Sequence, residues 1–125
     1  MSKIAAIVVA FVALIHVYIA WFEIFAWQSR GPKVFSAFPV ELFAPTTPMA
    51  ANQGLYNGFL AAGLFWSIFI KDAKWQRYVA TCFLLFVAVA GIFGALTVET
   101  RILFVQLAPA ALGLVCVWFV SPRTD

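Results

Sequence analysis

The first long apolar segment, residues 4–27, constrains this chain more than any other feature of the sequence. As a helix it is long enough to cross the ~30 Å hydrocarbon core of a bilayer, at ~1.5 Å per residue. Two ionisable residues, His16 and Glu23, lie inside it. Their spacing places them on one helical face, roughly 10 Å apart along the axis. A charge that faces lipid at this depth costs at least ~3 kcal/mol, so this face must contact other protein or water.

The composition indicates an integral membrane protein. Hydrophobic residues make up 65% of the chain and charged residues only 10%, whereas about a quarter of the residues are charged in a typical soluble domain. The net charge of +3 is small and is spread over the connections, which excludes a nucleic-acid-binding footprint. Cys82 and Cys116 both lie in apolar segments without metal-ligand spacing, so no metal site is predicted.

Four apolar segments predict an all-α protein, a single domain (1–125) folded as a four-helix transmembrane bundle. The expected helices cover about residues 4–27, 49–70, 78–98 and 102–120, with the first one uncleaved. Gly31 and Pro32 are expected to end the first helix. The apolar residues of the 28–48 connection suit a short interfacial helix broken at Pro39, although a packed loop fits equally well.

The basic residues favour a cytoplasmic location for both termini. Four spans place the N-terminus, the 71–77 connection and the C-terminus on one side. That side holds Lys3, Lys71, Lys74, Arg77 and Arg123, while the other holds Arg30, Lys33 and Arg101. The positive-inside rule therefore predicts that the first side is cytoplasmic.

Polar side chains converge in one half of the predicted bundle. Counted along each helix, Glu23, Gln53, Asn57, Thr97 and Gln106 fall at similar depths in the outer half, and His16 lies deeper, near the midplane. The other half is almost entirely apolar. This asymmetry predicts a one-sided polar chamber that opens toward the 28–48 and 99–101 connections.

Such a chamber could hold or pass a proton between Glu23 and His16, which are the candidate catalytic residues. Fixed donors and acceptors suited to orienting a carbonyl, hydroxyl or quinone-like head group come from Asn52, Gln53, Tyr56, Asn57 and Gln106.

Structural alternatives exist for the same residues. Glu23 could pair with Arg30 or Arg101, and His16 could be a satisfied interhelical hydrogen-bonding residue. Asn52 could be only the N-cap of the second helix.

Two further features concern helix packing. The spacing of Gly54, Gly58 and Ala62 predicts a smooth stripe for close helix contact. Pro109 is expected to free the carbonyl of Val105 from helical hydrogen bonding.

The string Asn52-Gln53-Gly54-Leu55-Tyr56-Asn57-Gly58 resembles the bacterial small integral membrane proteins grouped as domain of unknown function 1304. The resemblance extends to His16 with the string 23–27, to 33–35, to 90–97, and to Gln106 with Pro109, so it covers all four helices. It implies a four-helix protein of the bacterial inner membrane with a shared polar constellation. It implies no activity.

The leading hypothesis is an intramembrane pocket in the outer-leaflet half that binds or transforms a small amphipathic ligand. One alternative is a small transporter or proton-conducting subunit, which would need a polar path through the apolar half as well. Another is a non-catalytic membrane interaction protein whose polar layer is structural. The expected partners are membrane lipid and an amphipathic small molecule, with no nucleic acid. A homo-oligomer is left open, and neither a cofactor nor a reaction is identified.

Overall fold

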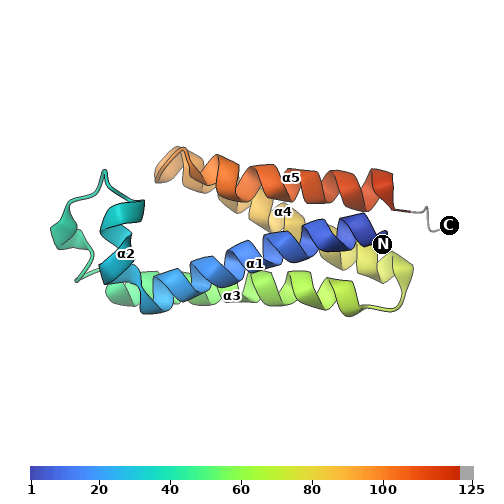
Figure 1. Cartoon of the computed structure of the whole chain (residues 1–125), viewed down its shortest axis with the longest axis horizontal. Coiled ribbons are helices and arrows are strands. Elements are labelled where there is room, and N and C mark those ends of the chain that lie inside the picture. Colours follow the sequence, from blue (N-terminus) through green and yellow to red (C-terminus); the bar gives the residue numbers. More distant parts are fainter. Residues whose placement is uncertain (122–125) are drawn as a thin grey trace.

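The computed structural model describes residues 1–121, and the regular elements of this part of the chain are all helices, without strands. Four long helical rods run alongside one another (Figure 1). They are α1 (Lys3–Phe25), α3 (Thr47–Phe69), α4 (Ala73–Thr97) and a last rod that joins η2 (Leu103–Leu107), α5 (Ala108–Val115) and η3 (Cys116–Val120). The prediction of an all-α fold is confirmed.

Three of these rods are long and apolar enough to cross a membrane. They are α1, α4 and the last rod, Leu103–Val120. The fourth, α3, has 23 residues, as many as α1. Its first half carries Asn52, Gln53 and Asn57, which lower its hydrophobicity. The described residues are therefore compatible with a membrane protein of at least three spans.

The first helix ends earlier than the sequence predicts. Ser2 caps its N-terminus by accepting from the Ala5 N–H, and Ala26, with φ of −126°, ends it after Phe25. The chain then turns into α2 (Trp27–Val34), which continues through Gly31 and Pro32. These two residues lie inside a second helix and do not terminate the first.

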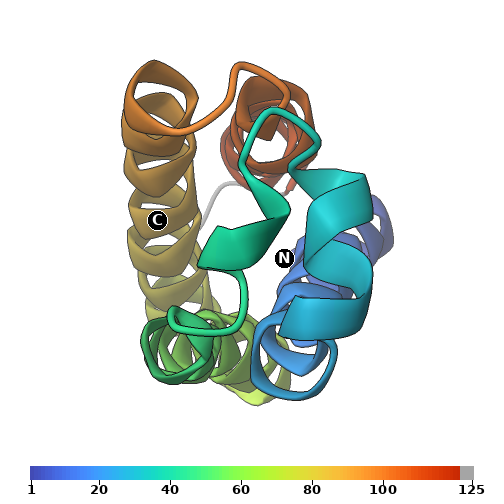
Figure 2. The ribbon, with the colours of Figure 1, turned by 90° about the vertical axis from the view of Figure 1, so that its left-hand side faces the viewer.

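An aromatic cluster holds α2 and the following loop in place. Trp27 packs against Phe22, Phe35 and Phe43, with ring centroids 5.2–5.7 Å apart. Gly31 faces the Phe43 ring so closely that a side chain at this position would overlap the ring. In Figure 2, α2 and η1 (Val40–Leu42) lie over the end of the bundle at which α1 ends.

The opposite end joins the two termini of the described chain. The Met1 ammonium donates to Gln76 Oε1 (2.7 Å), and the Ser2 N–H donates to Ser121 Oγ (3.0 Å). Between the two ends lies a core of small and branched residues from all four rods, which includes Val9, Val12, Leu64, Leu84 and Val117.

Helix contact along α3 follows a different spacing from the predicted stripe. Gly54 lies directly on α1, since an added Cβ would come within 3.0 Å of the Ala20 carbonyl oxygen. An added Cβ at Gly58 would meet nothing within 4 Å, and Ala62 is exposed. The buried positions are instead Ala50, Gly54, Asn57, Ala61, Gly63, Leu64 and Ser67, and all of them except Gly63 are spaced by three or four residues. This spacing is the one expected of rods that cross at a shallow angle.

Candidate functional site

The contact between α1 and α3 brings Glu23 and Asn57 together. Asn57 Nδ2 donates to Glu23 Oε2 at 2.9 Å and also lies 3.3 Å from the Gln53 carbonyl oxygen. Asn57 is buried and Glu23 is half-buried. Gly54 makes this pairing geometrically accessible, because its missing side chain lets α3 approach the backbone of α1 one turn away.

The pair leaves two oxygens without a hydrogen bond. Among residues 1–121, Glu23 Oε1 and Asn57 Oδ1 have no partner, and neither atom is fully buried. A carboxyl group beside a free amide oxygen can accept from a donor and, when protonated, can donate to an acceptor. The arrangement is therefore chemically suited to a polar group that enters between the two helices.

Glu23 does not pair with either of the arginines that the sequence suggests. Arg101 forms an ion pair with Glu99, at 2.9 Å between Nε and Oε1. Arg30 lies over the Trp21 ring at 5.2 Å and donates to the Tyr18 hydroxyl at 3.4 Å. Asn57 is thus the hydrogen-bond partner of Glu23 in the described part of the chain.

His16 lies on the core face of α1, with no exposed surface. Its Nδ1 lies 2.9 Å from the Val12 carbonyl oxygen. Because a carbonyl only accepts, Nδ1 must carry the hydrogen, and in the neutral ring Nε2 then presents a lone pair. Nε2 is buried and has no hydrogen-bond partner among residues 1–121. The imidazole therefore makes no interhelical hydrogen bond within the described chain.

The side chains of the remaining predicted site residues form no hydrogen bond with Glu23 in the described part of the chain. Asn52, Gln53 and Tyr56 have exposed side chains on α3. Asn52 is not the N-cap of this helix, which begins at Thr47. Gln106 is half-buried in η2, where its Cβ lies 3.1 Å from the Cβ position of Gly91 in α4.

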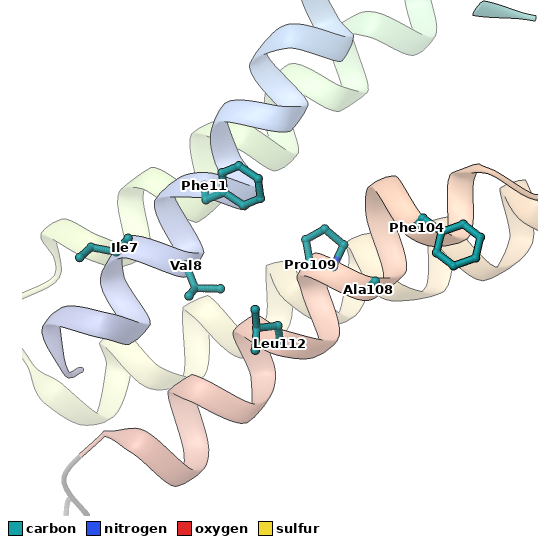
Figure 3. A pocket seen from close by; sticks show the side chains of 7 residues that line it. All are labelled: Ile7, Val8, Phe11, Phe104, Ala108, Pro109 and Leu112. Carbon is teal, nitrogen blue, oxygen red and sulfur yellow. The ribbon is translucent and has the colours of Figure 1, made fainter.

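An open groove that the sequence does not predict lies elsewhere in the bundle (Figure 3). Its volume is ≈ 430 Å³. Its lining consists of Ile7, Val8 and Phe11 of α1 with Phe104, Ala108, Pro109 and Leu112 of the last rod. All of these residues are apolar, and none belongs to the predicted polar site. Their only sequence signal is the proline in an otherwise continuous apolar segment.

No group of three or more metal-ligating side chains occurs in the described residues. The free thiols of Cys82 and Cys116 lie on α4 and at the start of η3, and Cys82 is exposed.

The comparisons with known proteins give a family but no activity. The chain is 31% identical, over 121 residues, to a protein of Lactococcus lactis subsp. lactis (strain IL1403) named "Uncharacterized protein YpaA". The alignment covers 95% of this chain and 100% of that relative. No solved structure matches the chain significantly. The family model described as "Protein of unknown function (DUF1304)" matches residues 10–118. The chain therefore belongs to the DUF1304 family, as the strings around His16, Asn57 and Gln106 predict.

Proposed function

We propose that this protein crosses the bacterial inner membrane four times and binds a small amphipathic molecule through Glu23 and Asn57. The observation that carries the binding proposal is the hydrogen bond between these two side chains, with one free oxygen on each. Burying a carboxyl group at a helix contact inside a membrane protein costs free energy unless hydrogen-bond partners compensate for the lost water, so such groups are often functional. Asn57 supplies one partner, and a ligand head group would supply the other.

The proposal assigns α3 as the fourth span. This helix packs between α1 and α4, both of which are apolar and long enough to cross a bilayer. Its second half is apolar except for Ser67, which is buried and donates to the Leu64 carbonyl oxygen. Asn57, its other buried polar residue, faces α1 and not the surroundings. In a four-span topology, the excess of basic residues beside the N-terminus and the 71–77 connection favours cytoplasmic termini.

The other predicted residues take supporting roles in this proposal. His16 would be the second proton-handling group, because its lone pair at Nε2 is not used within the described chain. Asn52, Gln53, Tyr56 and Gln106 would orient the ligand in the outer-leaflet half. The apolar character of α1 from Ile4 to Leu14 argues against a polar path through the other half, and hence against transport.

Glu23→Gln tests the binding site, because glutamine keeps the shape and the acceptor for Asn57 but removes the charge. The purified protein is released from mild detergent into a native mass spectrometer, and small molecules that co-purify are detected as added mass. We expect an adduct on the wild-type protein that disappears in Glu23→Gln, with unchanged or increased thermal stability. Glu99→Gln, which removes the carboxylate that pairs with Arg101, is the matched control and should retain the adduct.

The opposite pattern would show that the pair is only structural. In that case Glu23→Gln lowers the stability, and the mass spectra of wild-type and variant proteins carry the same adducts or none.

Thiol labelling tests the four-span topology. In a background with Cys82→Ala and Cys116→Ala, single cysteines are introduced as Ser36→Cys and Lys71→Cys. With α3 as a span, a membrane-impermeant maleimide labels these two positions from opposite sides of inner-membrane vesicles. Labelling of both positions from the same side would remove α3 from the membrane.

A further inference from the structure

The groove between α1 and the last rod faces the interior of the bilayer in the proposed arrangement. Both of its walls belong to helices that are apolar and long enough to cross a membrane. Its volume, ≈ 430 Å³, lies in the range of about 300–1,000 Å³ found for small-molecule sites. Water would find no polar side chain among the lining residues, so hydrocarbon is the occupant that fits the groove.

A backbone acceptor lies at one end of this groove. In the π-helical turn η2, the Ala108 N–H donates to the carbonyl of Leu103, five residues back. The next N–H in this pattern would serve the carbonyl of Phe104, but position 109 is proline and has none. The carbonyl of Phe104 therefore receives no bond from residue 108 or residue 109. The sequence predicts that Pro109 leaves the carbonyl of Val105 without a donor, whereas in the π turn the missing donor is that of Phe104.

A carbonyl group in a helix points toward the following turn, which here holds Ala108 and Pro109. Both residues line the groove (Figure 3). An unpaired carbonyl costs several kcal/mol in hydrocarbon, so a ligand that donates a hydrogen bond to it would be strongly favoured. Apolar walls along the groove and an unpaired acceptor at one end together define the shape of an amphiphile.

We infer that the groove binds one hydrocarbon chain of a membrane lipid whose head group carries a hydrogen-bond donor, and that this donor bonds to the Phe104 carbonyl. The inference depends on the membrane-spanning part of the proposed function but not on the site at Glu23 and Asn57.

The test compares two lipids with identical acyl chains. Phosphatidylethanolamine carries N–H donors in its head group, whereas the choline group of phosphatidylcholine carries none. The protein is equilibrated with an equimolar mixture of the two in mixed micelles and examined by native mass spectrometry. We expect one retained lipid, with a preference of roughly 5-fold for phosphatidylethanolamine, as one hydrogen bond supplies.

Two variants test separately how the groove binds the hydrocarbon chain of the lipid and how it recognises the head group. Ala108→Phe fills the groove and should abolish retention of either lipid, whereas Ala111→Phe adds the same bulk at an exposed position outside the groove and should not. Pro109→Ala supplies an N–H for the Phe104 carbonyl, so this variant should keep the lipid but lose the preference for phosphatidylethanolamine. Circular dichroism and gel filtration establish that each variant is folded.

The inference is overturned if wild-type protein retains no lipid, or if Ala108→Phe and Ala111→Phe retain lipid equally. Equal retention of both lipids by the wild-type protein would overturn the role of the Phe104 carbonyl. The Pro109→Ala measurement tests that role even if the Ala108→Phe variant fails to fold. Because Glu23 is not in the groove, loss of the adduct in Glu23→Gln with lipid retention intact separates the two sites.

Discussion

Gly54 and Gly58 form a matched pair that measures how closely α3 must approach α1. A Cβ at Gly54 would lie 2.8 Å from Ile24 Cγ1, 3.0 Å from the Ala20 carbonyl oxygen and 3.0 Å from Glu23 Cβ. The Ile24 side chain can rotate away, but the Ala20 oxygen belongs to the backbone of α1. A Cβ at Gly58, one turn later, would meet nothing within 4 Å.

Replacing each glycine with alanine changes the stability in opposite directions. Both variants gain up to ~1 kcal/mol from the higher helix propensity of alanine. Gly54→Ala also forces the two helices apart by a few tenths of an ångström, and overpacking of this kind costs about 1–3 kcal/mol. Because the propensity gain is common to both, Gly54→Ala should be less stable than Gly58→Ala by about 1–3 kcal/mol.

The assay is unfolding of the purified protein in mixed micelles by increasing sodium dodecyl sulfate, followed by circular dichroism. Gly58→Ala should be as stable as the wild-type protein or slightly more stable. If Gly54→Ala proves as stable as Gly58→Ala, the close contact between α1 and α3 does not exist in the folded protein. The geometry that brings Asn57 to Glu23 would then lose its support.

Four other substitutions test the packing by the same unfolding measurement. Leu84→Ala, at a side chain with 0% exposure, should lower the free energy of unfolding by about 2–5 kcal/mol. Leu85→Ala, at 47% exposure, should lower it by less than ~1 kcal/mol. Equal losses in the two variants would refute the placement of the core. His16→Leu removes a buried nitrogen that has no partner among the described residues, so it should be neutral or stabilise the protein by about 1 kcal/mol. A clear loss of stability would indicate a partner outside the described residues, such as an internal water. Gly91→Ala should cost about 1–3 kcal/mol, because its Cβ would lie 2.8 Å from the backbone nitrogen of Leu107, and full stability of this variant would argue against the contact of α4 with η2.

The sequence predicts the long helices because each requires only a sustained apolar segment between polar connections. It also predicts that Glu23 and Asn57 lie at similar depths, since depth follows from the rise per residue. Which polar groups meet is a different question, because it depends on the rotation of each helix. Gln106 turns toward Gly91 of α4, while Asn57 turns toward α1. Counting along a single helix does not fix such rotations.

Local signals fail where tertiary packing outweighs them. Gly31 and Pro32 disfavour a helix, yet α2 runs through both, because the Phe43 ring packs on Gly31 inside the aromatic cluster around Trp27. The predicted stripe at positions 54, 58 and 62 fails for a geometric reason. A strict spacing of four advances 40° around the helix at each step, so it leaves the contact face after one turn. Apart from Gly63, the buried residues are spaced by three or four positions and stay on that face.

The polar residues that the sequence predicts at one depth divide between two helix contacts, and this division bears on what they do. Glu23 and Asn57 lie where α1 meets α3, and Gln106 lies where α4 meets η2. A layer that only fixes helix register needs its polar groups to bond to each other, as Asn57 does with Glu23. Gln106 has no hydrogen-bond partner among residues 1–121, and neither has Nε2 of His16. A purely structural role therefore accounts for the pair of Glu23 and Asn57, and it does not account for Gln106 or for Nε2 of His16.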